Sequence, residues 1–418
     1  MNKPDLLIKN IGLLATPQGS CSAAGPRQKE IRYITDAYIF VSGRDIVEIG
    51  TAEQLARGNW PREEMTVIDA RGSLVTPGLV DAHTHLIFSG WRQQELPLKL
   101  QGLSYLEILQ RGGGILHTVR NTRKASLEEL VNDGEIRLKK MLAHGTTTCE
   151  VKSGYGLNFQ DEMKSLEAVA ELNELGLIDL VPTFLGAHAI PEEYQGNKEK
   201  FITLLTEEII PAVREKGLAE FCDVFCEEGV FDLEEARLIL EWGCRYGLLP
   251  KIHADEITPL GGAGLAASLK AVSADHLIQA ADADLAEMAR AGTIAVLLPG
   301  TSFYLGEKFA RAREMVDKGI PVAVASDFNP GSSPNESLQL PMNLACLKYK
   351  LLPSEVLTAV TLNAAAALNR AASIGTLEVG KKADIVIWDA PDLEYIFYRY
   401  GTNLVKKVIK NGKVVSSN

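Results

Sequence analysis

The sequence has 418 residues, of which 46% are hydrophobic and 23% are charged, and its formal net charge is −11. This composition is ordinary for a globular protein, and the length fits a barrel of about 250 residues with a smaller domain beside it. The negative charge argues against nucleic-acid binding, which requires basic surfaces, but it is compatible with an anionic small molecule held by a local arginine.

The sequence shows no sign of membrane insertion or secretion. No apolar run reaches the roughly 20 residues that a membrane-spanning helix needs. The N-terminal stretch MNKPDLLIKN lacks the uninterrupted apolar core of a signal peptide. We therefore expect a cytoplasmic protein without a membrane partner.

Both ends of the chain are rich in predicted strands. Residues 37–50 alternate as strand, turn and strand, and residues 405–415 form a second hairpin with Asn411-Gly412 as its tight turn. Strands at both ends suggest that the termini pair with each other. We expect residues 1–76 and 372–418 to form a composite β-sandwich domain.

The middle of the chain, residues 77–371, alternates between strands and helices. Ser126 and Glu129 have the spacing of a capping box at the start of one helix. The strand candidates, in chain order, are residues 79–83, 146–151, 179–188, 219–225, 249–254, 272–277, 293–299 and 321–326. Eight strands that alternate with helices predict a distorted (β/α)8 barrel of the TIM type. A doubly wound open sheet is the alternative, although no GxGxxG follows any of the strands.

Two further patterns have more than one interpretation. The GGGI stretch at residues 112–115 is not followed by Lys-Ser/Thr, so we interpret it as a flexible lid or connection and not as a phosphate loop. Cys222 and Cys226 lie four residues apart on one strand, either as soft metal ligands or as buried thiols. No second cysteine pair completes a zinc cage, which favours buried thiols.

The histidines gather at predicted strand ends, where the active sites of such barrels lie. Five of the seven histidines fall there, with His117 and His144 as the exceptions. Random placement would scatter them along the chain. The five at the strand ends are His83, His85, His188, His253 and His276.

A metal centre is the simplest use of these residues. His83 and His85 are separated by one residue in an extended segment, so they point to the same side. His253 adds a third imidazole and Asp327 adds a carboxylate, a donor set that suits Zn²⁺ and also Fe²⁺. A catalytic ion keeps one position open for water and lowers the pKa of that water.

Two nearby residues have the chemistry to assist hydrolysis. Glu256 lies three residues after His253 and would either move the proton of the attacking water or orient His253. We favour the proton shuttle. His276 would donate a hydrogen bond to the oxygen that gains negative charge.

Several stretches resemble the amidohydrolase superfamily. They are PGLVDAHTH on strand one, the histidines of strands five and six, the SD pair of strand eight, and TLNAAAALNRAASIGTLEVGKKADIVIWD at the exit from the barrel. The resemblance covers nearly the whole chain. Two-metal members carry a bridging lysine on the fourth strand, but the fourth strand here has none and Lys152 lies on the second. The resemblance therefore implies one divalent ion per chain.

Within this superfamily the chain is similar to the imidazolonepropionase family. The matching stretches, in chain order, are DAHTHLIFSGWRQQE, GGGI, EVKSGYGL, TFLGAHAIPEE, FCDVFCEEGVF, HADE, SADHL and SDFNPGSSP. The resemblance implies hydrolysis of the cyclic amide of 4-imidazolone-5-propanoate to N-formimidoyl-L-glutamate, in histidine degradation. It also implies a homodimer that uses Zn²⁺ or Fe²⁺, with Fe³⁺ also compatible.

The same resemblance assigns roles to individual residues. The metal ligands match His83, His85, His253 and Asp327, and the catalytic residues match Glu256, His276 and Asp327. The substrate contacts match Arg92, Tyr105, Tyr155, His188, Glu256, Asn329, Gly331 and Ser332.

Two other functions are compatible with the residues alone. An aminohydrolase that acts on a ring such as cytosine or guanine would use the same metal, Glu256 and His276. A neutral base has no use for Arg92, however, whose planar guanidinium suits the carboxylate of a propanoate tail. A barrel that had lost its chemistry is the second alternative, but such a protein would lose metal ligands, and all four are present.

Overall fold

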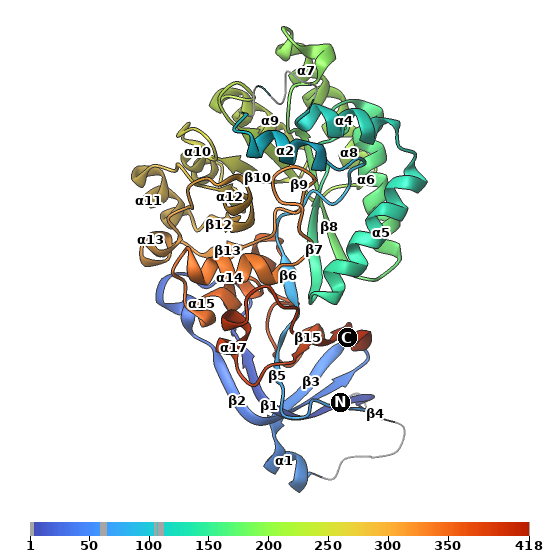
Figure 1. Ribbon diagram of the computed structural model, residues 1–418, viewed down its shortest axis with the longest axis vertical. Helices are drawn as coiled ribbons and strands as arrows, with labels where there is room; N and C mark the ends of the chain where they lie inside the picture. Colours follow the sequence, from blue (N-terminus) through green and yellow to red (C-terminus); the bar gives the residue numbers. More distant parts are fainter. Residues whose placement is uncertain (1–3, 59–64, 104–106, 108–112, 418) are drawn as a thin grey trace.

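The computed structural model describes residues 4–58, 65–103, 107 and 113–417. A barrel surrounded by helices forms the upper part of the molecule, and a smaller β domain that contains both chain ends lies below it (Figure 1). The predicted fold class, a distorted (β/α)8 barrel with a β domain built from both termini, is confirmed.

The barrel has eight parallel strands that pair in chain order. They are β6 (Leu79–Asp81), β7 (Thr146–Lys152), β8 (Asp179–Ala187), β9 (Phe221–Cys226), β10 (Leu249–Ala254), β11 (Ser273–His276), β12 (Ile294–Leu297) and β13 (Val322–Val324). The segments after β6 and β13 close the ring. The N–H of Asp327 donates to the carbonyl of His83 at 3.1 Å, and the N–H of His85 donates to the carbonyl of Phe328 at 2.8 Å. This closure excludes the doubly wound sheet.

Helices cover the outside of the barrel. They are α2 (Leu96–Leu100), α4 (Ile115–Lys124), α5 (Leu127–Ala143), α6 (Phe159–Glu174), α7 (Lys198–Thr203), the π-helical η4 (Leu204–Ile209), α8 (Ile210–Glu215), α9 (Leu233–Arg245), α10 (Gly262–Ser268), α11 (Asp282–Ala291), α12 (Pro299–Leu305), α13 (Ala312–Asp317), α14 (Gln339–Leu347), α15 (Pro353–Ala359) and α16 (Leu362–Ala367). Helix α5 begins with the predicted capping box. Ser126 Oγ accepts the N–H of Glu129 at 3.2 Å, and Glu129 Oε2 accepts the N–H of Ser126 at 2.8 Å. In the described ranges, no helix combines the length and apolar character needed to cross a bilayer.

The β domain is one hydrogen-bonded sheet made from both ends of the chain. Its strands are β1 (Leu6–Thr16), β2 (Arg32–Ser42), β3 (Asp45–Thr51), β4 (Thr66–Asp69), β5 (Leu74–Pro77), β14 (Ile385–Trp388), β15 (Val405–Lys410) and β16 (Lys413–Ser417). The order is β16-β15-β14-β5-β1-β2-β3, with β4 paired to β1. The predicted Asn411-Gly412 turn joins β15 to β16, and its φ angles of 49° and 76° are those of a tight hairpin turn.

Two contacts fix the barrel on the sheet. Gly78 lies between β5 of the sheet and β6 of the barrel, and a Cβ there would fall 2.3 Å from Thr147 Oγ1, so only glycine fits. The buried ammonium of Lys410 donates to Asp384 at 2.7 Å and to Asp179, the first residue of β8, at 2.8 Å. These contacts join the amino-terminal end of the barrel strands to the sheet.

The remaining sequence predictions have mixed outcomes. Cys222 and Cys226 are free and buried, as predicted. Gly112 lies outside the described residues, so a lid at GGGI stays a prediction. Gly114, directly before α4, has a φ of 70°, and its N–H donates to Glu95 Oε1 at 2.7 Å.

Candidate metal centre and active site

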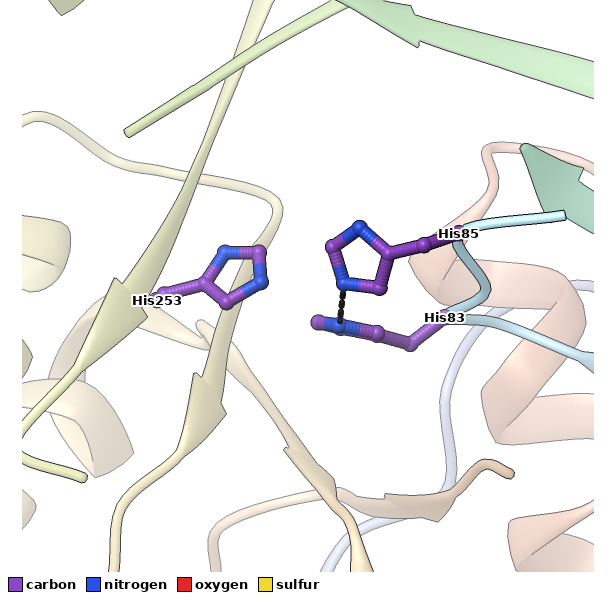
Figure 2. A group of neighbouring side chains, drawn as sticks. All are labelled: His83, His85 and His253. Atoms are coloured by element: carbon purple, nitrogen blue, oxygen red, sulfur yellow. Dashed lines mark hydrogen bonds between the residues drawn. The ribbon is translucent and has the colours of Figure 1, made fainter. Parts of the chain in front are cut away.

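The four predicted metal ligands lie together at the carboxyl ends of the barrel strands. Figure 2 shows the rings of His83 and His85 side by side, with the ring of His253 facing them from the end of β10. The Nε2 atoms of His83 and His85 are 3.2 Å apart. Asp327 Oδ1 lies 3.4 Å from each of these nitrogens. All four side chains are buried.

These separations fit one tetrahedral metal ion. Metal–nitrogen bonds of about 2.0–2.1 Å place two ligand atoms roughly 3.3 Å apart. The observed values are 3.2 Å between the two nitrogens and 3.4 Å from each to the carboxylate oxygen. Within the described part of the chain, the buried Nε2 of His253 has no hydrogen-bond partner, which leaves it available as a third nitrogen. The residues present therefore fit a divalent cation.

The backbone turns sharply where two of the strands end. Asp327 has a φ of 51° and His276 has a φ of 71°, in the left-handed region that asparagine, aspartate and histidine tolerate best among non-glycine residues. Such a conformation costs about 1–3 kcal/mol and persists only where the surroundings impose it. The hydroxyl of Thr301 on α12 donates to Asp327 Oδ2, which leaves Oδ1 facing His83 and His85.

Two buried aspartates lie behind the histidines. Asp275 Oδ2 is 2.6 Å from His83 Nδ1, and Asp223 Oδ2 is 3.0 Å from His253 Nδ1. The contact at His83 is a hydrogen bond, whereas the contact at His253 is within ion-pair distance. A carboxylate at Nδ1 orients the ring, favours the tautomer with its proton on Nδ1, and makes the opposite nitrogen a stronger ligand. In both rings the opposite nitrogen is the Nε2 that faces the candidate metal position.

A cluster of buried ion pairs fills the barrel beneath these aspartates. Lys152 Nζ lies 2.6 Å from Asp223 Oδ2, 2.9 Å from Glu150 Oε2 and 3.4 Å from Asp275 Oδ2. Lys251 Nζ lies 2.7 Å from Glu150 Oε1. All five side chains have no exposed surface. We call Glu150, Lys152, Asp223, Lys251 and Asp275 the buried charge cluster.

The charges of this cluster set the protonation of its neighbours. Burial alone would lower the pKa of Lys152, but Asp223, Glu150 and Asp275 raise that pKa above its usual value. Burial would raise the pKa of Asp275, but Lys152 and Lys251 lower it overall. Burial also works against a charged His83, but hydrogen bonds to Asp275 and Asp327 raise its pKa to about 9.

His85 differs from His83 because its surroundings favour the neutral ring. Burial lowers the pKa of His85 to about 4, despite a hydrogen bond to Asp327. The ring of His188 stacks on that of His85, with centroids 4.9 Å apart. Neutral imidazole is the form that binds a metal ion. Near pH 7, His85 therefore needs no deprotonation before it can act as a ligand.

Glu256 and His276 face each other beside the candidate metal position. His276 Nδ1 lies 3.4 Å from Glu256 Oε1, and this nitrogen has no hydrogen-bond partner among the described residues. Burial, followed by the charges of Asp327 and Glu227, raises the pKa of Glu256 to about 8. Burial lowers the pKa of His276 well below its usual value, so its ring is neutral at pH 7.

Arg92 lies against Gly331, in the loop that follows Asp327. A Cβ on Gly331 would fall 0.9 Å from Arg92 Nη2, so the guanidinium occupies the space that any side chain would need. The Nε of Arg92 is buried, has no hydrogen-bond partner among the described residues, and lies 3.9 Å from Glu95 Oε1. Lys99 Nζ donates to the carbonyl of Gly331 at 3.1 Å. Within the described ranges, Arg92 therefore keeps an unused donor close to the loop that follows Asp327.

Asn329 and Ser332 form a turn that satisfies most of their own polar groups. Asn329 Oδ1 accepts the N–H groups of Gly331 and Ser332, both at 2.8 Å. Asn329 Nδ2 donates to the carbonyl of Asp327 at 2.7 Å and to Ser332 Oγ at 2.9 Å. The turn holds the segment that follows Asp327 in place. Its contact with a substrate stays a prediction.

The other predicted substrate residues have different outcomes. The ring centroid of Tyr155 lies 5.9 Å from that of His85 and 5.3 Å from that of His188, so both predicted residues adjoin the histidine group. Tyr105 lies outside the described residues. His117 on α4 and His144 after α5 stand apart from the group, as their sequence positions predicted.

Sequence reasoning missed the buried charge cluster. Of its five members, the sequence singles out only Lys152, as a lysine on the second strand and not on the fourth, and it assigns no role to Glu150, Asp223, Lys251 or Asp275. The available signal was a charged residue inside each of four apolar strands, in TTTCEVK, FCDVFC, LPKIHA and SADH. Such residues are almost never fully buried unless they are paired.

Known proteins resemble this chain along its full length. Residues 251–415 match an amidohydrolase family profile, and residues 66–104 match a second profile of the same description. An imidazolonepropionase from Alkaliphilus metalliredigens is 51% identical over 419 aligned residues, which cover 98% of both chains. One from Brevibacillus brevis is 52% identical and covers 99% of this chain and 98% of that one.

Solved structures share the fold at much lower identity. Guanine deaminase from E. coli superimposes with a TM-score of 0.76 at 16% identity, over 99% of both chains. An adenosine deaminase from Xanthomonas campestris with bound zinc has a TM-score of 0.72 at 18% identity, over 99% of this chain and 93% of that one. At this identity the likeness concerns the fold alone.

The candidate centre predicts how the protein takes up a metal ion. We expect the wild-type protein to bind one Zn²⁺ per chain in a calorimetric titration. Mutation of a residue that orients a metal ligand lowers metal affinity by roughly 10–100-fold. The variant His253→Ala removes a ligand itself, so its Zn²⁺ affinity should fall by more than that. His144→Ala is the matched control, because His144 lies at the opposite end of the barrel and should leave the affinity unchanged. Wild-type affinity in His253→Ala would contradict the assignment.

Proposed function

The chain belongs to the imidazolonepropionases, a family of amidohydrolases, and we propose that it hydrolyses 4-imidazolone-5-propanoate to N-formimidoyl-L-glutamate in histidine degradation. The observation that carries the proposal is the joint presence of a four-donor centre, a proton-transfer pair and a partly buried arginine whose Nε has no hydrogen-bond partner among the described residues. We further propose a cytoplasmic homodimer, with residues 77–371 as its catalytic domain and residues 1–76 with 372–418 as its β domain.

One divalent metal ion per chain would be held by His83, His85, His253 and Asp327. We take this ion to be Zn²⁺ or Fe²⁺, and the trivalent Fe³⁺ is also compatible with the same ligands. Three imidazoles and one carboxylate suit these metals. When bound, the ion lowers the pKa of a water molecule and polarises the amide carbonyl. The protein's own contribution is to hold the four donors in place before the ion arrives.

Glu256 would move the proton. It accepts a proton from the water that attacks the ring carbonyl and delivers it to the ring nitrogen as the carbon–nitrogen bond breaks. A pKa raised to about 8 supports this role, because such a group can hold and release a proton near neutral pH. The alternative, that Glu256 orients His253, is weakened because Asp223 is the carboxylate at His253 Nδ1. Asp327 would share the handling of the proton.

His276 would stabilise the oxygen that becomes negatively charged. Its neutral ring carries one N–H, and its Nδ1 has no hydrogen-bond partner in the described part of the chain. A donor that is already oriented in a buried site stabilises developing charge strongly, because no solvent has to be reorganised. The protein thus supplies an acceptor of protons and a donor of hydrogen bonds on neighbouring strands.

Arg92 would bind the propanoate carboxylate. Its guanidinium can form two parallel charge-assisted hydrogen bonds with a planar carboxylate. Tyr105, Tyr155, His188, Asn329, Gly331 and Ser332 would complete the substrate contacts. Gly331 has a further role in this proposal, since any side chain there would displace the guanidinium.

Turnover of the proposed substrate is the direct test. Freshly generated 4-imidazolone-5-propanoate should be consumed by metal-loaded protein in an ultraviolet assay, with N-formimidoyl-L-glutamate as the product. A chelator should abolish turnover, and Zn²⁺ or Fe²⁺ should restore it. Protein that carries one metal per chain but shows no turnover would contradict the substrate while leaving the centre intact.

Replacement of Arg92 separates this substrate from a neutral base. Arg92→Ala should lower kcat/KM for the imidazolone by about 10–100-fold, because a charged hydrogen bond is lost. Arg92→Lys keeps the charge but not the planar guanidinium, so its kcat/KM should lie between those of the wild type and Arg92→Ala. The metal content should be unchanged in both variants. Wild-type kinetics in Arg92→Ala would remove the carboxylate role and favour a ring aminohydrolase.

Replacement of Glu256 tests the proton shuttle. Glu256→Gln preserves size but cannot accept a proton, so kcat should fall by about 10²–10⁴-fold while the metal content stays the same. Glu228→Gln is the control, because Glu228 is an exposed carboxylate at the end of the neighbouring strand β9. A kcat within the wild-type range for Glu256→Gln would be incompatible with this role.

A further inference from the structure

Lys152 has no part in the proposed reaction, yet it pairs with three buried carboxylates inside the barrel, where Lys251 pairs with one. Its ammonium, on β7, contacts Glu150, Asp223 and Asp275 at 2.9, 2.6 and 3.4 Å, and its side chain is fully buried. Burying an ion pair costs desolvation free energy that a well-packed apolar side chain would avoid. Stability alone is therefore a weak reason for a lysine at this position.

The contacts of Lys152 lead directly to two of the candidate metal ligands. The Asp223 oxygen that Lys152 contacts, Oδ2, is the one that lies 3.0 Å from His253 Nδ1. The Asp275 oxygen that it contacts, also Oδ2, is the one that lies 2.6 Å from His83 Nδ1. One ammonium thus bridges two carboxylate–histidine pairs from different strands.

We propose that Lys152 is a positioning residue for the metal centre, one that holds Asp223 and Asp275 so that the Nε2 atoms of His253 and His83 face one ion. This inference rests on the proposed function, because it needs the metal centre to exist. Without the ammonium, the carboxylates of Asp223 and Asp275, which have oxygens within 4.8 Å of each other, would repel each other and turn away from the rings. The ring nitrogens would then lose their fixed tautomer and direction.

The ammonium of Lys152 also lies where a second metal ion could otherwise bind. Two groups of potential metal donors besides the three histidines are His83 with Glu150 and Asp275, and Asp223 with His253 and Asp275. The carboxylates in both groups are the ones that Lys152 contacts. A lysine fixed among them favours a centre with a single ion.

Lys251 provides a matched control. It is equally buried in the same cluster, but its partners are Glu150 at 2.7 Å and the carbonyl of Ala82 at 3.4 Å. Among the described residues, no ion pair joins Lys251 to Asp223 or Asp275, and the lysine that pairs with these two aspartates is Lys152. Replacement of either lysine by methionine removes one buried positive charge and nearly preserves the volume of the side chain. A general loss of stability should therefore affect both variants.

The test compares Zn²⁺ affinity, measured by competition with a chromophoric chelator, in Lys152→Met and Lys251→Met. The thermal midpoint of each metal-free variant is measured in parallel. Lys152→Met should lose about 10–100-fold in affinity, whereas Lys251→Met should lose less than about threefold at a comparable drop in midpoint. Equal losses in the two variants, or none in Lys152→Met, would overturn the positioning role.

A milder pair of variants covers the case in which Lys152→Met does not fold. Ser273 Oγ donates to Asp275 Oδ1 at 2.7 Å, and Thr183 Oγ1 donates to Glu150 Oε1 at 2.6 Å. Ser273→Ala loosens a carboxylate that holds His83 and should weaken Zn²⁺ binding by about 3–10-fold. Thr183→Val should leave Zn²⁺ binding unchanged. Weaker Zn²⁺ binding in Thr183→Val than in Ser273→Ala would overturn the inference. If the wild-type protein binds neither Zn²⁺ nor iron, the metal centre itself fails, and the proposed function fails with it.

Discussion

The closure of the barrel between its first and last strands is the constraint on which the site depends. Two backbone hydrogen bonds make this closure, and they involve His83, His85, Asp327 and Phe328. The residues that complete the ring are therefore the same residues that carry three of the four candidate ligands. Any change that opens this seam also separates the histidine pair from the carboxylate, so folding of the barrel and assembly of the centre are one event.

Beneath the seam, the interior of the barrel is charged where most barrels are filled with branched apolar side chains. Three carboxylates and two ammonium groups lie there without exposed surface. Each carboxylate is compensated by at least one lysine, which is the condition under which buried charges are tolerated. The buried charges cost some stability, but they hold the aspartates that contact His83 and His253. Metal ligands have to be placed to within about 0.5 Å, so such support is needed.

The far end of the candidate site is built from connections and not from strands. Arg92, Glu95 and Lys99 lie between β6 and β7. Arg92 and Lys99 contact Gly331 in the loop that follows Asp327, and Glu95 lies within ion-pair distance of both. Deaminases with the same fold at 16–18% identity share the barrel, and loops are where such folds differ in what they bind. The candidate metal ligands therefore lie on the barrel, and the arginine that we propose to bind an anionic substrate lies on a loop.

The sequence by itself determined the fold class, the hairpin at Asn411-Gly412, the capped start of α5 and the grouping of histidines, because each depends on local periodicity or on the rule that strand ends meet. It did not determine that Asp223, Lys152 and Asp275 form one cluster, nor that Gly331 makes room for Arg92. These contacts join strands and loops that are distant in the chain, and the pairing of a buried charge depends on which neighbours the closed barrel brings to it. Periodicity shows which way a side chain points, whereas only the tertiary structure decides what it meets.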